Sequence, residues 1–184
     1  MTLKTSQLLI NFVNQHSHPR QPHRYWASEV YAIRKGYQTP ADFFNPKPID
    51  ITGARNIITG EAYEAQLKKV LEANKIKFSY GNDIKKEIHF TNDITLVVKL
   101  DFLMENWGLE TKKPVRQPDD IPEKWKDQLE CEYQAYHLPI YLGVFSEPFS
   151  IRYFRYKPSK RRWESIKKTL IDFDEKVKKY YDSK

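Results

Sequence analysis

The sequence has 184 residues, enough for one domain with a buried core and too few for a second independent one. Its 40% hydrophobic content is typical of a folded protein, whereas 30% charged residues and the lack of any apolar run of about 18 residues exclude an integral membrane protein. The net charge of +7 suits a polyanion such as nucleic acid, although many basic proteins bind none.

The N-terminus and the cysteine content indicate a protein of a reducing compartment. The N-terminal stretch MTLKTSQLLINFVNQ has too short an apolar segment for a secretory signal and no small-residue cleavage site. The single cysteine, Cys131, permits no internal disulfide and excludes a cysteine-rich zinc or iron–sulfur site. We therefore expect a cytoplasmic, intracellular protein with no membrane partner.

Helices and loops are predicted for the first part of the chain. Apolar residues at helical spacing predict a helix over 3–15, and a short helix is predicted over about 26–34. Three prolines predict a loop over 38–50.

A longer helix is predicted from Thr52 to about Asn74. Residues three or four apart would share its buried face: Ile57, Gly60, Glu64, Leu67 and Leu71. Glu64 is the carboxylate in this stripe. It either points inward, toward a metal ion or a basic partner, or lies at a frayed edge of the stripe.

Three strands are predicted next, over about 84–90, 94–104 and 107–113. In the second, alternation divides the side chains between two faces: Leu96, Val98, Leu100 and Phe102 on one, and Val97, Lys99, Asp101 and Leu103 on the other. In the third strand, Glu110 and Lys112 share a face.

The remaining elements complete a pattern of mixed helices and strands. A helix is predicted over about 123–137 and two strands over 140–145 and 150–156. A long amphipathic helix with a lysine-rich outer face ends the chain. We expect one domain, in which residues 1–50 form N-terminal helices and a loop, 51–157 a catalytic core and 158–184 the C-terminal helix.

The sharpest motif is Asp101 followed, after eight intervening residues, by Glu110, Thr111 and Lys112. A short hairpin would bring the two carboxylates and the ammonium together. Such a group can hold a divalent cation for phosphodiester hydrolysis, with the lysine orienting or deprotonating the water. The same residues can also be ordinary polar residues on the solvent side of a hairpin. However, both carboxylates interrupt apolar strands, where unpaired charge is costly.

A second cluster, near the C-terminus, is basic and interleaved with aromatic residues. Its cations are Arg152, Arg155, Lys157, Lys160, Arg161 and Arg162. They can bind backbone phosphates while the aromatic rings stack on unpaired bases, or they can form a solvated strand edge and helix start.

The order of elements and motifs resembles a PD-(D/E)XK nuclease of the RecB-like branch, which includes CRISPR-associated single-strand exonucleases and small archaeal virus nucleases. Five features occur in the order of that branch over roughly residues 25–145. They are a helix with Ser28 and Arg34, the G-x-x-x-E of Gly60 and Glu64, the strand Asp101, the E-x-K of Glu110 and Lys112, and a helix with Gln128 and Tyr133.

The resemblance implies an α/β (α+β) fold with a restriction-endonuclease-like αβββαβ core, a mixed central sheet flanked by helices. It also implies that Glu64, Asp101, Glu110 and the Thr111 carbonyl hold Mg²⁺ or Mn²⁺. Lys112 would be the catalytic lysine, and Gln128 would position it or the DNA. Ser28, Arg34 and Tyr133 would join Arg152, Arg155, Lys160, Arg161 and Arg162 as nucleic-acid-binding residues.

The sequence departs from the branch at three places. Glu64 stands where many members have histidine, which leaves an all-oxygen site. Tyr133 comes one residue later than the commonest spacing. The cysteines that hold an iron–sulfur cluster in the CRISPR-associated members are missing near Ala32–Ile33 and in the C-terminal region, so we expect no cluster.

These inferences favour a metal-dependent DNA nuclease, an exonuclease on single-stranded or processed duplex ends, working inside a cell, which for a viral protein is the host cell. The alternatives are a nuclease-fold protein that binds nucleic acid without cleaving it and a subunit of a larger DNA-processing complex. Homo-oligomers and complexes with a partner nuclease or helicase are both compatible with the sequence.

Overall fold

The computed structural model describes residues 5–15, 20–91, 93–147 and 149–183. Its larger sheet has the strand order β2-β5-β6-β7-β8. These strands are β2 (Phe78–Tyr80), β5 (Phe102–Met104), β6 (Gly108–Lys112), β7 (Ile140–Ser146) and β8 (Ser150–Arg155). Strands β6 and β7 are parallel and the other neighbouring pairs are antiparallel, so the sheet is mixed.

A smaller sheet has the order β1-β4-β3. It consists of β1 (Arg24–Trp26), β4 (Thr95–Val98) and β3 (Lys86–His89), with β1 parallel and β3 antiparallel to β4. The short strand β1 was not predicted, because its three residues acquire their partners only when β4, some 70 positions later in the chain, lies alongside.

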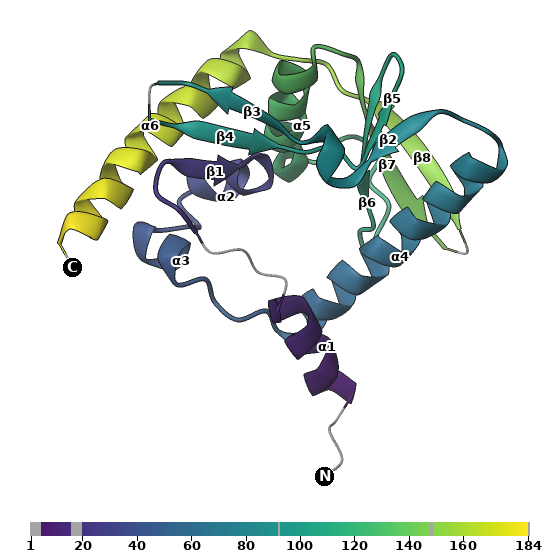
Figure 1. The fold of residues 1–184 in the computed structure, drawn as a ribbon, viewed down its shortest axis with the longest axis horizontal. Coiled ribbons are helices and arrows are strands. Elements are labelled where there is room, and N and C mark those ends of the chain that lie inside the picture. Colours follow the sequence, from purple (N-terminus) through teal and green to yellow (C-terminus); the bar gives the residue numbers. More distant parts are fainter. Residues whose placement is uncertain (1–4, 16–19, 92, 148, 184) are drawn as a thin grey trace.

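The helices surround these sheets (Figure 1). They are α1 (Thr5–Gln15), α2 (Val30–Arg34), α3 (Pro40–Phe44), α4 (Ile51–Ala73), α5 (Glu123–Tyr136) and α6 (Lys160–Asp182), with short 3₁₀ helices at Ala27–Glu29 and Gly81–Ile84. No helix in the described ranges is long and apolar enough to cross a membrane.

The two faces of the larger sheet are covered by different helices. Leu67 and Leu71 of α4 pack with Leu109 of β6 on one face. Residues of β6 alternate, so Glu110 and Lys112 lie on the opposite face, in register with Leu142 and Val144 of β7. Those two residues belong to the main core that α5 and α6 complete. The predicted mixed sheet flanked by helices is therefore confirmed.

The single strand predicted over 94–104 is wrong, because the chain breaks at Lys99–Asp101 and passes from one sheet to the other. Asp101 Oδ2 accepts hydrogen bonds from the Thr111 amide at 2.7 Å and the Thr111 hydroxyl at 2.6 Å. A side chain thus takes an amide donor that a continuous backbone ladder would have used.

The loop predicted over 38–50 is also wrong, because it contains α3. Thr39 caps this helix by accepting from the Asp42 amide at 3.1 Å, and the Asp42 carboxylate accepts in return from the Thr39 amide. Pro40 stands at the first turn, where its missing N–H costs nothing. Proline here begins a helix. On α4, Ile57 is exposed and Ala54 takes its place in the buried face.

Gly108 generates a stability prediction. A Cβ there would lie 2.4 Å from Leu100 Cδ1 and 2.9 Å from Ile140 Cδ1. We expect Gly108→Ala to lower the free energy of unfolding by about 1–3 kcal/mol through overpacking. The matched control is Gly60→Ala on α4, where a Cβ meets nothing within 4 Å and helix propensity should add roughly 0.8 kcal/mol. Urea denaturation measures both, and equal effects of the two substitutions would contradict this account.

Candidate active site

Asp101 and Glu110 lie next to each other where β5 meets β6. The register pairs Phe102 with Leu109, so the next opposing positions along the hairpin are Asp101 and Glu110. The Asp101 carboxylate is fixed by its two hydrogen bonds from Thr111. Glu110 is 3% exposed, so the two carboxylates share one enclosed corner of the sheet.

Lys112 and Gln128 both donate to the same oxygen of Glu110. Lys112 forms an ion pair with Glu110 Oε1, and Gln128 Nε2 donates to that atom at 2.6 Å. Gln128 comes from α5, which covers this face of the sheet, and its amide also donates to Glu132 Oε1 at 2.9 Å. The structure therefore brings Asp101, Glu110, Lys112 and Gln128 together, as their predicted roles require.

Glu64 reaches the same corner from α4. Burial raises the pKa of Glu64 to about 8, and the carboxylates of Asp101 and Glu110 contribute to the rise. These electrostatic neighbours resolve the alternative left open by the sequence: Glu64 points inward from its helix. Burial, then the Asp101 charge, likewise raise the pKa of Glu110 to about 7.

Glu132 is a further member of the corner that sequence reasoning missed. It is completely buried, and burial followed by the charge of Glu110 raises its pKa well above the ordinary value. It follows Gln128 by four residues and so shares its face of α5, whereas Tyr133 is turned about 100° away and packs against the core. The predicted nucleic-acid-binding role of Tyr133 stays a prediction. Helical spacing from Gln128 was the signal that would have found Glu132.

The residues of this corner fit a hard divalent cation. Glu110 Oε2 and Glu132 Oε2 are buried with no hydrogen-bond partner in the described structure. The charge of Asp101 raises the pKa of both Glu64 and Glu110, an effect that a bound cation would oppose. All donors are oxygens, which Mg²⁺ and Mn²⁺ prefer. The described side chains of His, Cys, Asp and Glu form no ready-made group of three in metal-binding geometry.

Lys112 carries a positive charge in this environment. Burial disfavours the ammonium, but the carboxylates of Glu110 and Asp101 outweigh burial and raise the pKa of Lys112 above its ordinary value. As long as both carboxylates are ionised, Lys112 acts as a fixed cation that orients a neighbouring anion or water.

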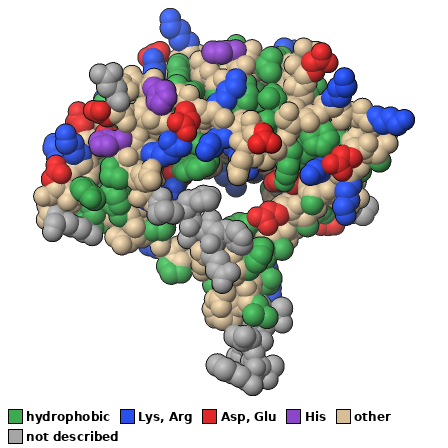
Figure 2. Space-filling model, viewed as in Figure 1, with side chains coloured by type: hydrophobic (Ala, Val, Ile, Leu, Met, Phe, Trp, Pro, Cys, Tyr) green, Lys and Arg blue, Asp and Glu red, His purple; other side chains and the backbone are tan. Residues whose placement is uncertain are grey.

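A groove of about 880 Å³ lies beside the break between β4 and β5, where Lys99 is part of its lining. Ser28 lines it together with three cations, Arg20, Lys47 and Lys99. Among the lining residues, Lys99 is close to the corner, because its positive charge lowers the pKa of Glu64. Figure 2 shows an open hollow between α4 and the remainder of the molecule, with Lys and Arg side chains along its upper rim and acidic side chains beside α4.

No protein-family model matches the sequence, and no curated protein matches it. Solved structures match it by fold. The crystal structure of SSO0001 superposes with a TM-score of 0.69 at 13% identity, covering 93% of this chain and 85% of SSO0001. LHK-Exo in complex with dAMP gives a TM-score of 0.63 at 10% identity, covering 88% of this chain and 91% of LHK-Exo. The chain therefore shares its fold with SSO0001 and with LHK-Exo.

Two residues predicted to bind DNA, Arg34 and Arg162, are held by carboxylates of α5. Asp127, which is completely buried, accepts from Arg34 Nε at 2.7 Å and from Arg162 Nη1 at 2.5 Å. Glu123 accepts from Arg162 Nη2 at 2.8 Å. The guanidinium groups thereby join α2, α5 and α6.

The other predicted basic residues lie away from the carboxylate corner. Arg152 stands over the Phe154 ring and donates to the Pro118 carbonyl at 3.4 Å. Arg155 and Arg161 line a second groove, and Lys160 is exposed at the start of α6. Whether any of them contacts DNA stays a prediction.

The raised carboxyl pKa values predict how stability depends on pH when no divalent cation is present. The folded protein binds the protons of Glu64 and Glu110 more tightly than the unfolded chain does, so their contribution is complete below the ordinary pKa of about 4.5 and is lost as pH rises through about 7 to 8. We expect the free energy of unfolding in EDTA to fall between about pH 5 and pH 8.5.

Glu64→Gln should reduce the steepness of this fall, and Glu61→Gln, at an exposed position of the same helix, should leave it unchanged. Urea denaturation across that pH range tests the pair. If the free energy of unfolding of Glu64→Gln fell with pH in parallel with that of the wild type, the raised pKa of Glu64 would be contradicted.

Proposed function

We propose that this protein is a metal-dependent nuclease that hydrolyses phosphodiester bonds in DNA. One observation carries the proposal: Glu64, Asp101 and Glu110 converge with Lys112 in a corner that also contains orphaned carboxylate oxygens. Burial raises the pKa values of these carboxyls, and a divalent cation would stabilise their ionised forms in place of protons. The nuclease-like fold supports the same conclusion.

Glu64, Asp101, Glu110 and the Thr111 carbonyl would hold Mg²⁺ or Mn²⁺. A divalent cation bound there supplies a nucleophilic water and neutralises charge on the scissile phosphate. Lys112 would orient the water and the phosphate as a fixed cation. Gln128 would hold Glu110 in place by donating a hydrogen bond to it. Glu132 would orient the Gln128 amide by accepting a second hydrogen bond from the same nitrogen.

The groove lined by Ser28 would deliver the substrate. Arg20, Lys47 and Lys99 provide cations along it for backbone phosphates, and Lys99 stands two residues from Asp101. We propose an exonuclease on single-stranded or processed DNA ends, by analogy of fold with LHK-Exo, which was solved with dAMP. Residues 1–184 would act as a single nuclease domain inside the cell, alone, as a homo-oligomer, or with a partner nuclease or helicase.

Cleavage of end-labelled DNA tests the proposal. We expect the wild type to degrade single- or double-stranded DNA with Mg²⁺ or Mn²⁺ and to be inactive in EDTA. Lys112→Met should reduce the rate by at least roughly 10²-fold, since it removes the cation that faces the reacting phosphate. Lys113→Met is the matched control, because Lys113 pairs with Glu147 and lies over Tyr63.

Full cleavage by Lys112→Met, or cleavage by the wild type in EDTA, would contradict the mechanism. Tight DNA binding without cleavage under every condition would instead identify a DNA-binding protein that retains the nuclease fold.

Metal binding can be measured without activity. At about pH 8 Glu110 is mostly ionised and Glu64 about half ionised, and a bound cation displaces the remaining proton, so we expect Mn²⁺ or Mg²⁺ to raise the Tm of the wild type, by an amount that grows with cation concentration. Glu110→Gln removes one ligand charge and should abolish most of this shift, whereas Glu105→Gln, exposed on the same hairpin, should not. Equal shifts in all three proteins would place cation binding elsewhere.

A further inference from the structure

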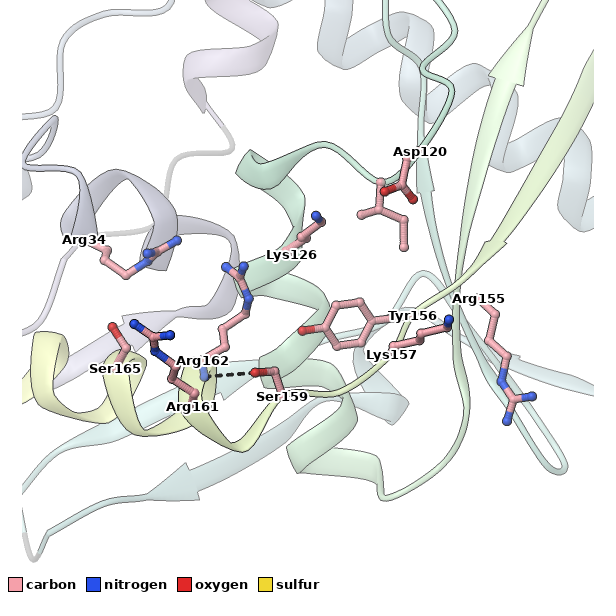
Figure 3. Close-up of a pocket in the computed structure, with 11 residues that line it drawn as sticks. Arg34, Asp120, Lys126, Arg155, Tyr156, Lys157, Ser159, Arg161, Arg162 and Ser165 are labelled. Atoms are coloured by element: carbon pink, nitrogen blue, oxygen red, sulfur yellow. Dashed lines mark hydrogen bonds between the residues drawn. The ribbon is translucent and has the colours of Figure 1, made fainter.

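A second groove, of about 630 Å³, lies where α2, α5, β8 and α6 meet (Figure 3). Figure 3 shows Arg34, Lys126, Arg161 and Arg162, from three different helices, around one depression, with Ser159 and Ser165 beside them, while Arg155 extends away from the group. The basic residues that line it are Arg34, Lys126, Arg155, Lys157, Arg161 and Arg162.

This groove is separate from the carboxylate corner. Gln128 and Glu132 point from α5 toward the sheet, where they meet Glu110. Lys126 precedes Gln128 by two residues, which is about 200° around a helix of 3.6 residues per turn. The groove and the corner therefore lie on opposite sides of α5, on the order of one helix diameter, about 10 Å, apart.

The groove has an excess of positive charge. Its acidic neighbours are Asp120 on the lining, Asp127 and Glu123. Asp127 and Glu123 both pair with Arg34 and Arg162, and Glu123 also pairs with Lys126 at 3.7 Å. These offset three of the six cations. Among the residues that the structure describes, Arg155, Lys157 and Arg161 form no ion pair. Exposed cations gathered in a concave site attract a polyanion.

The wall of the groove is preformed. The buried carboxylate of Glu130 accepts from the Tyr156 hydroxyl at 2.6 Å and from the Ser159 amide at 2.8 Å. Ser159 in turn caps α6 by accepting from the Arg162 amide at 3.3 Å. The connection from β8 to α6 is thus anchored in the core, and the first turn of α6, with its positive dipole end, faces the groove. A rigid basic site binds with less ordering cost than a mobile one.

We propose that this groove is a second DNA-binding site, which holds the phosphodiester backbone of a strand that extends beyond the catalytic corner. The inference rests on the proposed nuclease function. A short strand can occupy the corner and its adjoining groove, whereas only a longer one passes around α5 to reach the second groove. Affinity for DNA then increases with strand length because of Lys126, Lys157 and Arg161.

The test measures binding of labelled oligothymidylates of about 6 and about 30 nucleotides by fluorescence anisotropy in EDTA, where no cleavage is expected. The groove variant combines Lys126→Gln, Lys157→Gln and Arg161→Gln. The control variant combines Lys176→Gln, Lys178→Gln and Lys179→Gln, which removes the same charge from exposed positions at the far end of α6.

In the wild type, we expect the longer strand to bind at least tenfold more tightly than the shorter one. In the groove variant this ratio should approach one, and the slope of log K against log salt for the longer strand should lose about 2, since each phosphate contact contributes roughly 0.7. The control variant should retain both the ratio and the slope. A Lys157→Arg, Arg161→Lys variant, which keeps the charge, should bind as the wild type does.

Equal ratios and slopes in the groove and control variants would overturn the proposal, because binding would then follow net charge alone. Loss of the length effect in the charge-retaining variant would overturn it as well. Failure of the nuclease proposal is recognised separately, because a protein that never cleaves can still show the length effect, and a protein that cleaves can lack it.

Discussion

The burial of several carboxylates in one corner of the sheet is the constraint on which the rest of the structure depends. Glu64 comes from α4, Asp101 from the bend that precedes β5, Glu110 from β6 and Glu132 from α5, and Lys112 is the cation among them. Burial and the neighbouring carboxylates together raise the pKa values of Glu64, Glu110 and Glu132, although the Lys112 ammonium lowers them. The fold holds these groups together because apolar packing on both sides of the sheet fixes their backbone positions.

The break between β4 and β5 serves this arrangement. A continuous strand would have tied the Thr111 amide into a regular ladder. The chain instead turns at Lys99–Asp101, and Asp101 binds Thr111 with its side chain. The two halves of the broken strand enter different sheets, and Asp101 lies in the bend between them, where its charge acts on Glu64 of α4. The local disruption is part of the site's construction.

A second set of buried carboxylates joins the helices. Asp127 binds Arg34 and Arg162, and Asp174 of α6 accepts from the Tyr25 hydroxyl at 2.6 Å and contacts His23 Nδ1 at 2.8 Å. These contacts connect the N-terminal segment to α6, across most of the sequence.

The sequence by itself determined the order of the main elements and the motif Asp101, Glu110 and Lys112, because strand alternation and interrupted apolar runs are local properties. Tertiary structure alone decided the inward direction of Glu64 and the two-sheet division of residues 94–104. It also decided that Arg34 and Arg162 meet Asp127. Each of these features depends on which distant segment of the chain packs alongside. The periodicity of side chains within one helix or strand does not specify that segment.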